Sequence, residues 1–396
     1  MISPFICYTV SFVSVVLVYL LGWSDLYPRL SVGLLVFLGM SVILSSVSHY
    51  VIRKKIVFKE IEPFKFLPVT GTTIFIYILW IIEFIYEGGV GVPLLKILFH
   101  LPYNYRLFGV PSLHVFVVTF SSFFTIYLFH LYISKKGEPS ARLFLLLYLI
   151  NLAAAILIYS RAMLFFNLTG SLFVYMMSLK SLPYKKVAIV GAIVILLLFF
   201  FGVLGSLRVS REAGEPYNNE NFMDTGKASE TFRQSIIPKE YFWTYIYVSS
   251  PLANLQYNIE RNPAPRFTWD RLFWSGVYEC LPDFITKRIH TLRGTGPAKE
   301  YRIAFSFNVS TIYSRSYSYA EYGGILLMGV FLLLFPWFFL RLLNIGSDFF
   351  ITGWAILCTM YFFSSYDNTF RFTGLSFQLV YPVLLSLYEK FIKPVN

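Results

Sequence analysis

The stretch VAIVGAIVILLLFFFGVLGS, residues 187–206, decides the fold class of this chain. It contains no charged side chain, and its twenty residues match the length of an α-helix that crosses the hydrocarbon of a bilayer. The sequence therefore predicts an all-α polytopic membrane protein with about ten transmembrane helices. The other predicted spans are 4–22, 29–52, 66–86, 110–133, 142–159, 163–179, 320–340, 349–365 and 373–388.

Composition agrees with this fold class. Of the 396 residues, 57% are hydrophobic and only 14% are charged, whereas a soluble domain is close to a quarter charged. The net charge of +12 could suggest a nucleic-acid partner. In membrane proteins, however, basic residues are placed according to topology, so we expect no nucleic-acid binding.

Several chemical classes lack their sequence signatures. The three cysteines, Cys7, Cys280 and Cys358, are too few for a disulfide framework. The five histidines form no zinc-ligand spacing, and no phosphate-binding loop of the ATPase type occurs. We therefore expect neither a metal nor another cofactor.

Basic residues predict the orientation. With the N-terminus inside, the inner connections hold fourteen of them, whereas the short outer connections hold five: Arg29, Lys96, Arg106, Arg161 and Arg371. We expect a multi-pass protein of the bacterial inner membrane with both termini cytoplasmic. The predicted units are a seven-span bundle at 1–206, a periplasmic loop at 207–318 that covers an outer-leaflet site, and a three-span segment at 319–396.

The loop is rich in aromatic residues, as in YFWTYIYVSSPLANLQYNIE at 241–260. Tyrosine and tryptophan at this density are typical of a membrane–water interface, so this stretch predicts an amphipathic helix on the outer leaflet. The alternative is a small folded cap with its own core.

Ionisable residues gather on the outer side, where the sequence predicts the site. They include Glu83, Glu87, His114 and the pair Asp367 and Arg371. Arg161 lies between two apolar stretches, at 143–160 and 162–179, that otherwise lack charge. It is either part of the site or a topological marker whose side chain reaches the lipid headgroups. Outer arginines suit a lipid diphosphate, because guanidinium groups bind phosphate oxygens bidentately.

Three segments resemble Wzy-type O-antigen polymerases, also called oligosaccharide repeat unit polymerases. They are YSRAMLFFNLTGSLF at 159–173, YVSSPLANLQYNI at 247–259 and NVSTIYSRSYSYAEYGGILLMG at 308–329. The resemblance covers essentially the whole chain, including the long loop before the last spans. In the third segment Asn308 and Thr311 match the family's Asn-x-x-Thr element. Glu321, Tyr322 and Gly323 stand where the family has Asp-Phe-Gly.

The resemblance implies a polysaccharide polymerase that transfers a growing glycan from undecaprenyl diphosphate to a new repeat unit. The expected partners are undecaprenyl-diphosphate-linked oligosaccharides, membrane lipid and a candidate chain-length regulator protein. The leaving diphosphate needs cations, for which Arg161 and Arg266 are the candidates, and the acceptor hydroxyl needs a base, for which Glu321, Asp224 and His290 are the candidates. The candidate substrate-binding residues are Arg302, Arg315, Asn308, Thr311 and Arg371.

Three alternatives stay open. An O-antigen ligase would use the same donor and a different acceptor. A flippase or transporter for the lipid-linked unit is a different class, although the chain lacks the internal repeats and mid-membrane charges typical of transporters. The candidate bases could also be ordinary ion pairs of the loop.

Overall fold

The computed structural model of the chain describes residues 2–104, 107–179, 184–212, 216–262 and 267–392. This part folds into helices, and its only bridge of the β type joins Ser24 and Ala228. Six helices of the described residues are long and apolar enough to cross a membrane. They are α2 (Val32–Ile52), α3 (Val69–Tyr86), α5 (Leu113–Ser134), α6 (Ser140–Leu157), α8 (Tyr184–Glu212) through its part Gly191–Ser210, and α14 (Ser314–Leu342).

These helices confirm the prediction of a helical membrane protein. Two further predicted spans, at 4–22 and 349–365, coincide with the shorter apolar helices α1 (Pro4–Tyr19) and α15 (Phe350–Phe363). The predicted span at 163–179 is α7 (Arg161–Ser178), and that at 373–388 falls on α16 (Thr373–Ser376), η2 (Phe377–Leu379) and α17 (Val380–Ile392). The total of about ten spans stays a prediction.

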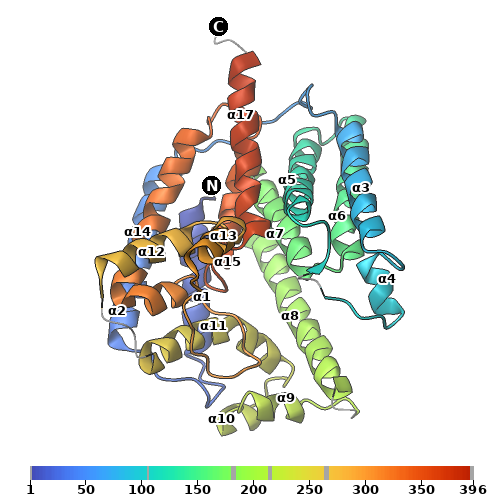
Figure 1. Ribbon diagram of the computed structural model, residues 1–396. Helices are drawn as coiled ribbons and strands as arrows, with labels where there is room; N and C mark the ends of the chain where they lie inside the picture. The colour runs from blue at the N-terminus through green and yellow to red at the C-terminus, as the bar shows by residue number, and fades with distance from the viewer. Residues whose placement is uncertain (1, 105–106, 180–183, 213–215, 263–266, 393–396) are drawn as a thin grey trace.

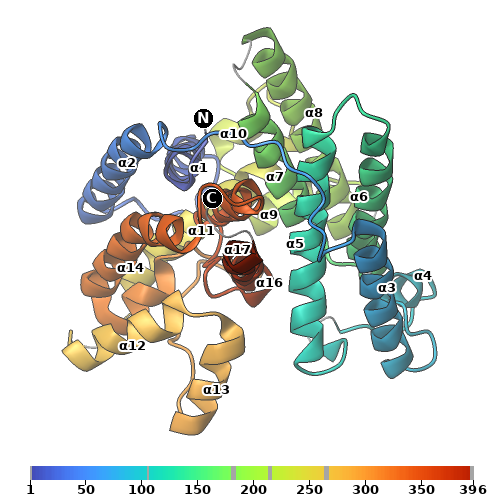
Figure 2. The same cartoon turned by 90° about the horizontal axis from the view of Figure 1, so that it is seen from above.

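The bundle has two sides joined by a buried centre. Figure 2 shows α3, α4 (Pro93–Leu98), α5 and α6 on one side, and α1, α2 and α14 on the other. Between them α15 is buried along almost its whole length, with Trp354 fully enclosed. Figure 1 shows α9 (Glu220–Thr225) and α10 (Glu230–Arg233) at the end of the molecule opposite to α17.

The helix predicted to lie on the outer leaflet is buried instead. This helix, α11 (Tyr241–Arg261), packs against α1, α8 and α14, and most of its residues are enclosed. Small residues such as Ser249 and Ala253 allow close packing, and its first turns share a second hydrophobic core with Phe222 and Phe232. The first half of the segment therefore matches the alternative, a folded cap with its own core, whereas Leu252, Ala253 and Leu255 belong to the main core of the bundle.

The last long helix, α14, is broken near its start. Ala320 and Glu321 have non-helical backbone angles, with φ of +51° at Glu321. The break brings Gly324 so close to Ser316 that a Cβ on Gly324 would lie 1.9 Å from the Ser316 carbonyl oxygen, so only glycine fits there. The first turns of α14, which carry Arg315, therefore follow a different direction from its membrane part.

Candidate functional site

The loop and the last helices enclose a polar cavity of about 140 Å³. Its wall comes from three places: the end of α12 (Trp269–Cys280) with the start of α13 (Asp283–Arg293), the segment 300–315, and the turn after α15. Its lining residues are Glu279, Asp283, Glu300, Arg302, Asn308, Ser310, Thr311, Ile312, Arg315, Asp367, Asn368, Arg371 and Phe372.

Two asparagines of α11 hold the segment that carries much of this lining. Asn254 donates through Nδ2 to the carbonyl oxygens of Phe307 and Val309, both at 2.7 Å, and its Oδ1 accepts from the backbone N–H of Ile303. One turn later Asn258 accepts from Tyr301 and donates to Ser318. An extended segment without a partner strand thereby obtains its hydrogen bonds from buried amide side chains, which fixes its position.

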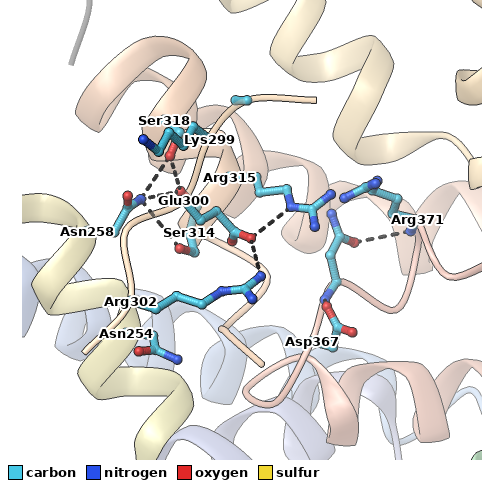
Figure 3. Close-up of polar contacts among 12 residues, drawn as sticks. Asn254, Asn258, Lys299, Glu300, Arg302, Ser314, Arg315, Ser318, Asp367 and Arg371 are labelled. Atoms are coloured by element: carbon cyan, nitrogen blue, oxygen red, sulfur yellow. Dashed lines mark hydrogen bonds and ion pairs between the residues drawn. The ribbon is translucent and has the colours of Figure 1, made fainter. Parts of the chain in front are cut away.

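Two arginines meet at one carboxylate in the cavity. Arg302 Nη2 and Arg315 Nε lie 3.2 and 3.0 Å from the same Glu300 oxygen, Oε2 (Figure 3). The Glu300 side chain is only 8% exposed. Among the described residues, Arg302 Nε and Arg315 Nη1 are buried and have no hydrogen-bond partner. Buried N–H groups normally have partners, so two arginines that line the cavity keep unused hydrogen-bonding capacity.

A buried carboxyl group faces the same space. Glu279 is 1% exposed, and its Oε2 accepts a 2.9 Å hydrogen bond from Asn368 Nδ2. Its other oxygen, Oε1, has no hydrogen-bond partner in the described part of the chain. Desolvation by burial raises the pKa of Glu279 to about 8, although the positive charge of Arg315 opposes the shift. Glu279 therefore keeps its proton at neutral pH.

A third arginine and two further acids complete the wall. Arg371 Nε lies 2.7 Å from Asp283 Oδ1, and the backbone N–H of Asp283 donates to the Arg371 carbonyl oxygen. Asp367, in the turn after α15, lines the cavity and keeps much of its side chain exposed. Desolvation raises the pKa of Asp367 to about 6, so it is mostly ionised at neutral pH. Figure 3 shows Arg302, Arg315 and Arg371 around one space, with Asp367 beside it.

A larger cavity of about 340 Å³ adjoins the first. Asn308 lines both cavities. Tyr366, which lines the larger cavity, directly precedes Asp367, which lines the smaller one. Aromatic side chains form much of its wall, together with hydroxyl groups and one arginine: Arg208, Phe222, Thr225, Trp243, Tyr247, Ser250, Ser306, Phe307 and Tyr366.

The structure brings together all five residues predicted to bind substrate, since Arg302, Arg315, Asn308, Thr311 and Arg371 line the first cavity. Arg161 does not line it. It lies at the start of α7, which begins with Ser160 as its N-cap, and its charge acts on the Tyr366 hydroxyl. Burial raises the pKa of Tyr366 to about 12, and Arg161 acts in the opposite direction.

The other predicted catalytic residues lie elsewhere. Glu321 is in the break of α14, and neither it, Asp224 nor His290 lines the cavity. Asp224 forms an exposed ion pair with Arg233, at 2.5 Å. His290 stacks on the Tyr278 ring with centroids 3.9 Å apart, and its Nδ1 is 3.1 Å from Thr295 Oγ1. Arg266 lies outside the described residues.

Glu83 and Glu87, two further acids expected near the site, belong to a separate polar network. His114 Nδ1 lies 2.8 Å from Glu83 Oε2. Glu87 pairs with Lys96 at 3.0 Å and accepts from the backbone of Gly109. These contacts join α3, α4 and the start of α5, so they stabilise that corner of the bundle.

Sequence reasoning missed Glu279, Asp283, Glu300 and Asn368. Each lies in or beside the loop, where a charged or amide side chain is usually solvated.

Within the described residues no three His, Cys, Asp or Glu side chains are placed to hold a metal ion. The cavity can instead bind an anion through guanidinium groups and exchange a proton through its carboxyl groups.

No protein-family model, curated protein or solved structure matches this chain.

Proposed function

We propose that this chain is a glycosyltransferase that polymerises lipid-linked oligosaccharide repeat units at the outer leaflet of a bacterial inner membrane. The growing glycan would pass from undecaprenyl diphosphate to a hydroxyl of a newly delivered repeat unit. One observation carries the proposal. A single cavity holds unpartnered guanidinium N–H groups and a buried carboxyl group with an unpartnered oxygen.

The arginines supply the contact to the donor diphosphate. The free N–H groups of Arg302 and Arg315 are held in place through Glu300, which fixes both guanidinium planes before substrate arrives. Preorganised donors of this kind stabilise charge that develops on a leaving group, and they act most strongly where water is excluded. Arg371, held by Asp283, adds positive charge on the opposite wall.

The carboxyl groups supply the proton chemistry. The acceptor oxygen forms a bond to the anomeric carbon while the bond from that carbon to the diphosphate oxygen breaks, and the electron pair leaves with the diphosphate. Asp367, ionised at neutral pH, takes the proton of the acceptor hydroxyl. Glu279, protonated at neutral pH, donates a hydrogen bond from its free oxygen to the departing diphosphate.

The resemblance to Wzy-type polymerases supports this proposal through the residues that it covers. The segment 308–329 supplies Asn308, Thr311 and Arg315 to the cavity, and the segment 247–259 supplies Asn254 and Asn258, which hold the same wall through its backbone. The adjoining aromatic cavity offers ring faces and hydroxyl groups next to the proposed base, where an acceptor sugar would need to lie.

Deletion of the gene in its native host separates the proposed polymerase from its alternatives. Loss of a polymerase leaves single repeat units attached to the surface lipid, and the wild-type gene restores the long chains. Loss of a ligase leaves long chains on the lipid carrier and none on the surface acceptor. Loss of a flippase leaves single units on the cytoplasmic side. Either of the last two outcomes would refute polymerase activity.

A further inference from the structure

Two helices of the loop present apolar side chains to their surroundings. On α12, Trp269 is 78% exposed and Phe273 is 62% exposed; on α13, Leu292 is 87% exposed. Trp269 and Phe273 are four residues apart, so they lie on one helix face. The opposite face of α12 carries Ser275, Tyr278 and Glu279, which are buried, and Glu279 lines the cavity. The hairpin α12–α13 therefore has the polar cavity on one side and an exposed apolar face on the other.

The position of α12 along α14 gives its depth in the membrane. The uncharged part of α14 runs from residue 323 to 340, between Glu321 and Arg341. A Cβ on Gly276 would lie 3.3 Å from Leu327, and one on Gly324 would lie 3.4 Å from Ser275 Oγ. Leu327 lies about 9 Å along the helix axis beyond Glu321, at 1.5 Å per residue. Hence α12 packs beside the first turns of the apolar part of α14, within the leaflet on the loop side.

The chemistry of the two helices fits that position. Amphipathic helices at a membrane surface bury their apolar face about 5–10 Å into the boundary between headgroups and acyl chains. Tryptophan prefers this boundary. On α13 the exposed basic residues Lys287 and Arg288 lie beside exposed Ile285, and Arg288 extends over the Phe284 ring. Basic side chains next to apolar ones reach lipid phosphates while their neighbours enter the acyl region.

We propose that the hairpin α12–α13 is embedded in the loop-side leaflet, with Trp269, Phe273 and Leu292 in the lipid and Lys287 and Arg288 at its phosphates. The hairpin then separates bilayer lipid from the arginine cavity by one helix thickness. A lipid-linked substrate would reach the cavity sideways past this helix. The location of the hairpin does not depend on glycosyl transfer, so the two proposals can fail separately.

Environment-sensitive labelling of the full-length protein in lipid nanodiscs tests the location. A fluorescent label is attached to Phe273→Cys in a Cys280→Ala background, since Cys7 and Cys358 are buried. Two exposed apolar positions serve as controls: Leu334→Cys on the membrane part of α14, which matches Phe273 in exposure, and the fully exposed Ile236→Cys between α10 and α11. Trp269→Cys serves as a second hairpin variant if Phe273→Cys does not fold to the melting temperature of the parent.

We expect the label at 273 to be quenched by a nitroxide placed high on the acyl chain about fivefold more than the label at 236, and to resist aqueous iodide. The label at 334 should respond more to a nitroxide placed deep on the acyl chain. Iodide quenching at 273 equal to that at 236 would show an aqueous cap and overturn the proposal. Protection from both quenchers, with a cross-linked dimer through residue 273, would overturn it in favour of a second copy of the chain.

Discussion

Asn368, in the turn after α15, donates through one amide nitrogen to both the backbone carbonyl and the side-chain Oε2 of Glu279, each at 2.9 Å. The two contacts fix the Glu279 carboxyl in the wall of the cavity that the three arginines line, and its other oxygen, Oε1, has no partner among the described residues. A neutral carboxyl group is thereby held beside cations, which is the arrangement expected of a proton or hydrogen-bond donor.

The rate of glycosyl transfer should show a bell-shaped dependence on pH. Asp367 must be ionised to act as a base, so the rate should rise as pH passes through about 6. Glu279 must be protonated, so the rate should fall as pH passes through about 8. Rates of the purified protein between pH 5 and 9 measure both limbs. In Glu279→Gln the amide still donates a hydrogen bond and cannot ionise, so the alkaline limb should disappear. An unchanged alkaline limb would remove Glu279 from the chemistry.

The raised pKa of Glu279 also predicts how the free energy of unfolding depends on pH. Burial raises the pKa of Glu279 from its ordinary 4.5 to about 8, so in this window the folded protein binds a proton that the unfolded chain lacks. The free energy of unfolding should therefore fall as pH rises from about 4.5 to 8. The thermal midpoint in detergent should decline less for Glu279→Gln than for the wild type. Parallel pH profiles of the two midpoints would contradict the burial of an ionisable group.

Arg315→Lys should lower turnover by about 100-fold, because a lysine keeps the charge near Glu300 and loses the fixed planar fork. Arg233→Lys is the matched control, since Arg233 forms ion pairs with Glu220 and Asp224 away from the cavity. The control should retain the activity and the expression level of the wild type. Equal activity of Arg315→Lys and Arg233→Lys would show that the fork at 315 is dispensable.

Arg161→Ala should leave expression and membrane insertion intact, while cells display single repeat units in place of long chains. Arg161 lies close enough to Tyr366 to act on its hydroxyl, and Tyr366 adjoins Asp367. Arg161→Lys should restore part of the polymer, because it keeps the charge and loses bidentate binding. Surface polysaccharide profiles measure both effects. Normal chains in Arg161→Ala would return this residue to the role of a marker that reaches the headgroups.

Part of the lining of the candidate site could be predicted from the sequence. The arginines stood out because guanidinium groups bind a diphosphate bidentately, and Asn308 and Thr311 stood out through the family resemblance. The five candidate substrate-binding residues line the described cavity, whereas Arg161 does not and Arg266 lies outside the described residues. Their spacing in the chain, from 302 to 371, did not indicate which would lie together.

Three acids of the cavity, Glu279, Asp283 and Glu300, could not be predicted, because their role depends on burial that only tertiary packing creates. Glu279 and Glu300 look like ordinary loop carboxylates in the sequence and become enclosed when α12 packs on α14. The prediction for 241–260 was wrong for a related reason. Its aromatic side chains suggested headgroup contact, yet Asn254 and Asn258 bond to the loop backbone and require a buried position.

Cysteine labelling of intact cells should establish the orientation. Lys227→Cys and Lys299→Cys should react with a reagent that cannot cross the membrane, whereas Lys55→Cys and Lys136→Cys should react only after permeabilisation. The reason is the excess of basic residues in the connections that contain positions 55 and 136. The reverse pattern would place the cavity in the cytoplasm and remove the proposed substrates.

The most direct measurement uses the purified protein in nanodiscs with polyprenyl-diphosphate-linked repeat units as both donor and acceptor. The account predicts products of two or more units on one lipid, release of one polyprenyl diphosphate per bond formed, and the same rate with a metal chelator. The Arg315→Lys protein should form these products about 100-fold more slowly. Hydrolysis without chain growth, transfer only to a different lipid acceptor, or no reaction by the folded wild-type protein would contradict polymerisation at this cavity.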